Sequence, residues 1–69
     1  RLIGRSDTGA RVEIFLVSEE PDGAWITLAR PARRLRPGKI VTFDGEFAAE
    51  VVSKLDDGRL LVRFTSEGD

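Results

Sequence analysis

The chain of 69 residues contains no cysteine and no histidine. Without cysteine it can form neither a disulfide nor a thiolate metal site. Without histidine it lacks the commonest metal ligand and the commonest general base at neutral pH. A serine triad therefore cannot be assembled from these residues alone. We assign no catalytic residue to the chain, and we expect no metal site in it.

Long apolar segments are missing as well. No apolar run approaches the ~20 residues that a membrane-spanning helix needs, so we expect no membrane partner. The absence of cysteine fits a reducing compartment, and we expect the protein in the cytoplasm. The chain also begins without methionine and opens directly on a strand-like pattern. We therefore expect it to be a fragment of a longer protein.

The apolar residues that are present alternate with a period of two, which is typical of β-strands. Val12, Ile14 and Leu16, for example, fall on one face of a single run. No window reads as an amphipathic helix of useful length. The polar tail Thr65–Asp69 is expected to fray. Six strands are predicted, at Leu2–Arg5, Arg11–Ser18, Trp25–Arg30, Ile40–Phe43, Glu46–Leu55 and Arg59–Phe64.

Turn signals separate these runs. Asp22-Gly23, Asp44-Gly45 and Asp57-Gly58 are Asp-Gly pairs, which favour tight hairpins because both residues tolerate positive φ. Asp7-Thr8-Gly9 and Arg36-Pro37-Gly38 add two further breaks.

Six short antiparallel strands must bury one apolar face and protect two edges, and closure does both. We therefore predict an all-β fold, a small six-stranded antiparallel β-barrel. An open two-layer sandwich is the alternative, but a chain this short supplies little material for two layers. The residues predicted to lie inside the barrel are Ile14, Leu16, Val51 and Val62.

The positive charge of the chain is concentrated in residues 30–39, which we call the basic strip. It holds five of the 11 Lys and Arg residues and no acid, while the rest of the chain has six cations against 12 acids. This distribution favours an anionic partner, either RNA phosphate or an acidic protein surface. The alternative is a solvated loop whose arginines pair with nearby acids. The candidate RNA-binding or interdomain residues are Arg30, Arg33, Arg34, Arg36 and Lys39.

Two prolines and one leucine shape the expected form of the strip. Pro31 and Pro37 each fix φ, so we expect an extended rather than a helical segment. Leu35 is expected to pin the strip to the core. Trp25 could stack on a base, although packing against the core is the favoured interpretation. The four phenylalanines are interpreted as core or strand-face residues, and no pair of them has the spacing of an exposed stacking platform.

Several segments together resemble one known family. They are Arg1–Arg5, Thr8–Leu16, Trp25–Gly38, Phe47–Val51 and Gly58–Phe64, and the pattern Arg-Pro-x-basic-basic-Leu-basic-x-Gly at residues 30–38 is the most specific. The chain resembles the small inserted barrel domain of the S-adenosylmethionine:tRNA ribosyltransferase-isomerase family of the queuosine pathway. The resemblance covers essentially all 69 residues.

The resemblance implies a specific activity for the parent protein. Family members transfer the ribosyl part of S-adenosylmethionine to 7-aminomethyl-7-deazaguanine in tRNA and isomerise it, which gives epoxyqueuosine. S-adenosylmethionine would be the co-substrate of the full-length enzyme, with none bound by this domain alone. The implied partners are tRNA and a large α/β domain of the same polypeptide. Residues 1–69 would then be a single barrel domain, excised from a larger two-domain enzyme.

Part of the family pattern is missing from this chain. The Asn-Asp-Thr-basic-Val motif that precedes the barrel in the family is absent, and no catalytic residue can be carried over to any position. An inserted domain should have its two ends close together, so we expect the first and last strands to be neighbours. The alternative to this interpretation is a stand-alone RNA-binding or protein-binding barrel. The sequence leaves open whether the basic strip meets tRNA or the large domain.

Overall fold

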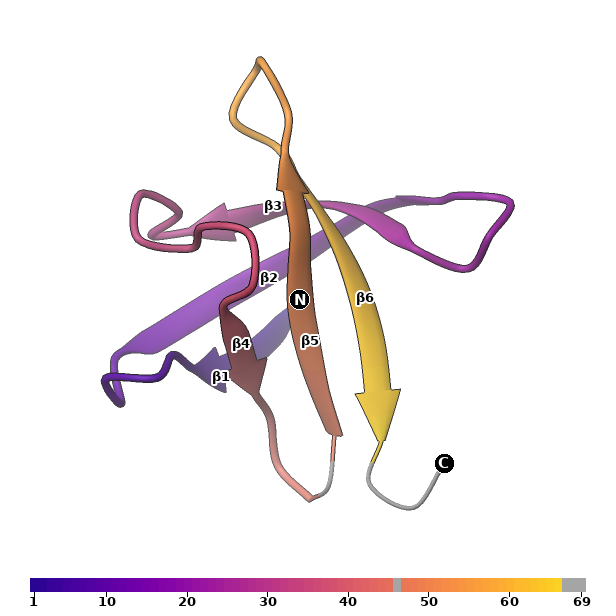
Figure 1. Cartoon of the computed structure of the whole chain (residues 1–69). Helices are drawn as coiled ribbons and strands as arrows, with labels where there is room; N and C mark the ends of the chain where they lie inside the picture. Colours follow the sequence, from indigo (N-terminus) through magenta and orange to yellow (C-terminus); the bar gives the residue numbers. More distant parts are fainter. Residues whose placement is uncertain (46, 67–69) are drawn as a thin grey trace.

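The computed structural model describes residues 1–45 and 47–66, and these form a closed barrel of six antiparallel strands (Figure 1). The described residues contain no helix, so the predicted all-β barrel is confirmed. The strands are β1 (Leu2–Arg5), β2 (Arg11–Glu19), β3 (Trp25–Arg30), β4 (Ile40–Thr42), β5 (Phe47–Lys54) and β6 (Leu60–Ser66).

The predicted strand positions agree with the observed ones to within two residues. The first and third strands have the predicted bounds. Thr65 and Ser66 extend β6, so the fraying expected there is wrong for these two residues. The remainder of the predicted frayed tail, residues 67–69, and the predicted start of the fifth strand at Glu46 lie outside the described residues.

The strand order around the barrel is β1-β2-β3-β6-β5-β4, and β4 closes back onto β1. The first and last strands are therefore not neighbours, and that expectation was wrong. The reason is that β3 pairs with β6, while the chain between β3 and β4 crosses to the far side and delivers β4 to β1 at Arg5↔Thr42.

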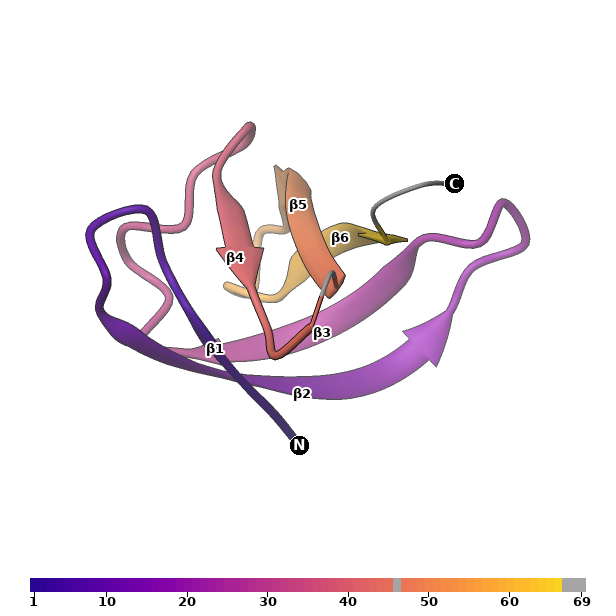
Figure 2. The ribbon, with the colours of Figure 1, turned by 90° about the horizontal axis from the view of Figure 1, so that it is seen from below.

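Because all neighbours are antiparallel, the barrel has two distinct ends. The β1–β2, β3–β4 and β5–β6 connections share one end, which we call the basic end. The start of β1 and the end of β6 lie at the opposite end, with the β2–β3 and β4–β5 connections. We call this the terminal end, and Figure 2 shows the barrel turned by 90°.

In the described hairpin turns, only glycine residues have positive φ. The amide of Gly23 donates to the Glu20 carbonyl at 2.9 Å, and φ of Gly23 is +89°. No described non-glycine residue has positive φ, so the tolerance of positive φ that favours Asp-Gly in turns is used here by the glycine only. Asp22 instead accepts a hydrogen bond from the Ala24 amide at 3.1 Å through its Oδ1 atom. This is the longer hairpin loop, in which a type I turn is followed by a left-handed glycine.

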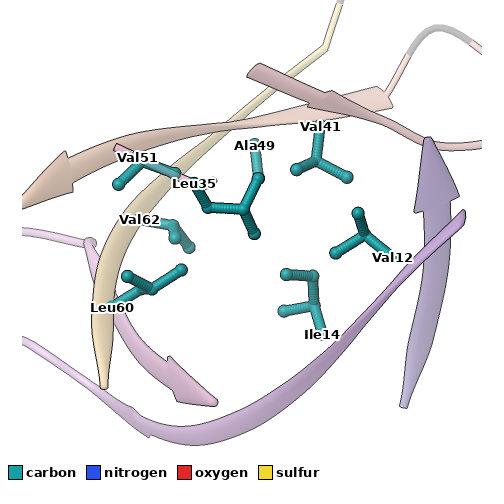
Figure 3. Close-up of a cluster of buried hydrophobic side chains, with 8 residues drawn as sticks. All are labelled: Val12, Ile14, Leu35, Val41, Ala49, Val51, Leu60 and Val62. Carbon is teal, nitrogen blue, oxygen red and sulfur yellow. The ribbon is translucent and has the colours of Figure 1, made fainter. Parts of the chain in front are cut away.

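The core fills the barrel with small aliphatic side chains (Figure 3). Ile14, Val51 and Val62 are buried as predicted, but Leu16 is 45% exposed and that prediction was wrong. Leu16 pairs with Thr27 of β3, but it lies beyond the last printed pair of β1 with β2, Leu2↔Ile14. The buried cluster consists of Val12, Ile14, Leu35, Val41, Ala49, Val51, Leu60 and Val62.

One member of this core does not come from a strand. Leu35 belongs to the basic strip, is only 3% exposed, and lies among the strand side chains in Figure 3. The expectation that it pins the strip to the core is confirmed. Its side chain fills the basic end of the barrel, where a six-stranded barrel would otherwise leave apolar atoms in contact with water.

Leu35→Ala should lower the free energy of unfolding by about 2–5 kcal/mol, because it removes buried methyl groups and leaves a cavity. Leu28→Ala is the matched control, since Leu28 is 48% exposed and should change stability by about 0.5 kcal/mol or less. Urea denaturation of both variants measures the difference. Equal, small losses for the two variants would contradict the anchoring role.

Candidate nucleic-acid interface

The basic strip folds into two consecutive turns between β3 and β4. The Leu35 amide donates to the Ala32 carbonyl and the Lys39 amide donates to the Arg36 carbonyl, each at 3.0 Å. The expected extended conformation was therefore wrong. Proline fixes φ but leaves ψ free, so Pro37 can precede a glycine at positive φ in a turn as well as it can extend the chain. The burial of Leu35 requires the turn.

Main-chain hydrogen bonds hold the strip against β5. The Gly38 amide donates to the Val51 carbonyl at 2.8 Å, and the Val51 amide donates to the Lys39 carbonyl at 2.9 Å. Lys54 adds a longer contact, in which its Nζ donates to the Ala32 carbonyl at 3.4 Å. These bonds fix the backbone of the strip, so its side chains project from a defined frame.

A cleft of about 580 Å³ lies between the strip and the β1–β2 turn, and we call it the basic cleft. Two buried core residues, Val12 and Leu35, contribute to its lining. The exposed lining includes cations from the strip and the polar side chains of the turn. The complete lining consists of Ser6, Asp7, Thr8, Ala10, Val12, Pro31, Arg33, Arg34, Leu35, Arg36 and Lys39.

The structure places the five candidate cations in three different environments. Lys39 Nζ lies 2.9 Å from Oδ2 of Asp7. The guanidinium carbon of Arg30 lies 5.6 Å from the centre of the Phe15 ring, outside the cleft lining. This distance is within the range of a cation–π contact.

The other three candidates, Arg33, Arg34 and Arg36, are exposed and line the cleft. Within residues 1–45 and 47–66 they form no ion pair. The solvated-loop alternative, in which the strip pairs with nearby acids, therefore describes Lys39 but not these three arginines. Three planar guanidinium groups with free donors on one cleft suit the oxygens of phosphate groups.

The Lys39–Asp7 contact joins the strip to the β1–β2 turn across the cleft. The hydrogen bond from Lys39, followed by its positive charge, lowers the pKa of Asp7 below the ordinary carboxyl range. Asp7 is an exposed group, so solvent screens this pair and its contribution to stability is small. The pair places Lys39 of the strip against Asp7 of the β1–β2 turn.

Aromatic residues gather at the opposite end of the barrel. Phe43, Phe47 and Phe64 form a cluster in which the rings of Phe47 and Phe64 stack with centroids 5.3 Å apart and planes 3° apart. Phe43 lies 5.4 Å from Phe47 and 6.3 Å from Phe64. Sequence reasoning missed this cluster because its members come from different segments, and the pairing of β5 with β6 brings two of them together.

The other aromatic expectations agree with the structure. Trp25 is half-buried and packs against the core, so the favoured interpretation of this residue is confirmed. Phe43 and Phe64 also pack against the core.

Residues 1–45 and 47–66 include no helix long and apolar enough to cross a membrane. They also include no group of three or more His, Cys, Asp or Glu residues arranged to hold a metal ion.

Comparison with known proteins identifies the family. The model of the queuosine biosynthesis protein family matches residues 1–69, the whole chain. The chain belongs to this family. The family membership that the sequence pattern indicated is therefore confirmed, and a stand-alone barrel of another kind is not favoured.

A solved structure supports the same assignment. The barrel is similar to part of the S-adenosylmethionine tRNA ribosyltransferase from Thermotoga maritima, with a TM-score of 0.77 and 25% sequence identity. The match covers 90% of this chain and 22% of that protein. The chain thus spans about a fifth of the length of this relative.

Lys39→Met should raise the pKa of Asp7 toward its ordinary value, because it removes the hydrogen bond and charge that hold it down. The pKa of Asp22 should stay low, because Asp22 accepts from the Ala24 amide and from Arg63. Since the folded-state pKa of Asp7 is lowered, the pair stabilises the fold above the ordinary carboxyl pKa and loses this effect as the pH falls through the lowered value. Carboxyl-carbon NMR titrations measure both groups, and an Asp7 titration that Lys39→Met leaves unchanged would rule out the contact.

Proposed function

We propose that residues 1–69 are the barrel domain of a larger tRNA-modifying transferase. The parent enzyme would transfer the ribosyl part of S-adenosylmethionine to 7-aminomethyl-7-deazaguanine in tRNA and isomerise it to epoxyqueuosine. The match of the queuosine biosynthesis family to the whole chain carries this proposal. The similarity to part of an S-adenosylmethionine tRNA ribosyltransferase supports it.

The role of the barrel in that enzyme would be to hold tRNA through the basic cleft. Arg33, Arg34 and Arg36 present forked donors that form no ion pair with any acid in the described part of the chain, and phosphate oxygens are acceptors of matching geometry. Asp7 and Lys39, on the two walls of the cleft, pair with each other at 2.9 Å. Contacts of this kind position a nucleic acid without reading its sequence, so the recognition of the target base would lie elsewhere in the enzyme.

The chemistry would also take place outside this chain. The chain has no histidine or cysteine, and the cleft lining offers three guanidinium groups, one lysine and one carboxylate that is paired with that lysine. Guanidinium groups stay protonated at neutral pH and cannot act as general bases. S-adenosylmethionine would therefore be the co-substrate of the full-length enzyme, bound by residues outside 1–69. A tRNA substrate also favours a cytoplasmic location.

The isolated chain should be catalytically inert. Incubation with S-adenosylmethionine and substrate tRNA should release no adenine, whereas the full-length enzyme should release it under the same conditions. Adenine is measured by chromatography. Release by the 69-residue chain at the full-length rate would overturn the assignment of the chemistry to the rest of the enzyme.

The isolated chain should bind tRNA weakly and with a modest salt dependence. If all five cations of the strip met phosphates, the log–log slope would be about −3.5 to −4.5, but contacts from Arg33, Arg34 and Arg36 alone give only about −2 to −3. The dissociation constant should be no tighter than roughly 10⁻⁴ M at physiological salt. NMR titration over a range of salt concentrations measures both quantities, and salt-independent binding would contradict phosphate recognition.

Arg33→Glu combined with Arg34→Glu in the full-length enzyme should raise KM for tRNA by about tenfold, which corresponds to ~1.4 kcal/mol. The KM for S-adenosylmethionine should change less. Arg59→Glu combined with Arg63→Glu is the control, because it makes the same change in net charge away from the cleft lining. Steady-state kinetics that show an unchanged KM for tRNA in the first variant would remove the tRNA role of the strip.

A further inference from the structure

The two ends of the barrel differ in chemistry as well as in topology. The basic end carries the basic cleft and is filled by Leu35, which is 3% exposed. At the terminal end, β1 begins and β6 ends, so any polypeptide joined to either strand leaves the barrel here. The barrel can therefore be joined to the rest of its protein at one end and bind a ligand at the other.

The terminal end has apolar residues that the barrel itself does not cover. Leu16 occupies an inward position of β2 and is 45% exposed. Phe47, at the start of β5, is 37% exposed. Leu2 at the start of β1 is half-buried.

The phenylalanine cluster is the most prominent part of this surface. Phe47 stacks on Phe64, and both lie near Phe43, so the three rings support one another in fixed positions. Phe43 and Phe64 also contact the core. A rigid, partly exposed aromatic group of this kind is characteristic of the centre of a protein–protein interface.

We infer that the terminal end is the surface with which the barrel docks onto the remainder of its own polypeptide. The inference rests on the proposed function, and the remainder is the large part of the enzyme that the chain does not span. Docking there would bury Leu16 and Phe47 and leave the basic cleft at the opposite end free for tRNA. On this inference the partner domain lies at the terminal end, and the basic strip is left for RNA.

The remainder of the polypeptide is favoured over a second copy of the barrel for a physical reason. A covalently joined partner that emerges beside the apolar surface has an effective concentration in the millimolar range, whereas a second molecule must associate from dilute solution. A second exposed apolar surface exists on the outer wall of β2 and β3, where Leu28 is 48% exposed opposite Phe15. Its side chains belong to the outer wall and not to the phenylalanine cluster, so it provides the control position.

Hydrogen exchange tests the inference in the full-length enzyme and in the 69-residue chain. Peptides that contain Phe47 and Phe64 should exchange at least tenfold more slowly in the full-length enzyme than in the isolated barrel. The peptide that contains Arg33 and Arg34 should exchange at the same rate in both.

Protection of the arginine peptide instead would overturn the inference and make the basic strip the interdomain contact. Equal exchange of all peptides would also overturn it, and so would protection that appears only at high protein concentration, which would indicate a second copy.

A pair of variants provides an independent readout. Phe47→Asp in the full-length enzyme should abolish the extra protection of the Phe64 peptide, while Leu28→Asp should preserve it. Loss of protection in both variants, or in neither, would contradict the assignment. Adenine release by the unmodified enzyme is measured in parallel. An enzyme that shows the protection but releases no adenine refutes the proposed function and not the docking surface, whereas an active enzyme without protection refutes only the docking surface.

Discussion

The burial of Leu35 is the interaction on which the functional surface depends. Five cations within ten residues repel one another, and such a segment would by itself remain solvated. One leucine in its middle, inserted into the barrel, forces two turns and brings the strip against β5. The same side chain contributes to the lining of the cleft and fills one end of the barrel. Stability and the presentation of charge are therefore linked through one residue, which explains why an apolar side chain lies among the arginines.

The closed antiparallel barrel separates two surfaces that a small open sheet would place side by side. Strand direction alternates around the barrel, so every second connection lies at the same end. The basic strip consequently lies at the end opposite the two outer strand ends. An anionic ligand at the cleft and an apolar contact at the phenylalanine cluster can then be accommodated at the same time. This arrangement suits a domain that is held by one partner while it contacts another.

Local features of the fold were predictable because they depend on neighbouring residues. Alternating apolar residues identified all six strands, and the Asp-Gly pairs identified three of the turns. The structure explains where the observed Asp-Gly turns and the exposure of Leu16 differ from the sequence pattern. The side chains of Asp22 and Asp57 accept main-chain hydrogen bonds within their turns, at negative φ. Leu16 continues the inward pattern of β2 past its last pair with β1. The alternation of apolar residues indicates on which face of a strand a side chain lies, but it does not indicate whether other residues cover that side chain.

The sequence by itself determined the strands, the glycines that turn the chain, the concentration of positive charge and the family. Each of these is a property of a short stretch or of an ordered set of stretches. Tertiary structure decided the strand order, the pairing of Lys39 with Asp7 across 32 positions, the cleft between them and the meeting of three phenylalanines. These features arise when the barrel closes, because closure selects which distant segments become neighbours. No local pattern of residues encodes that choice.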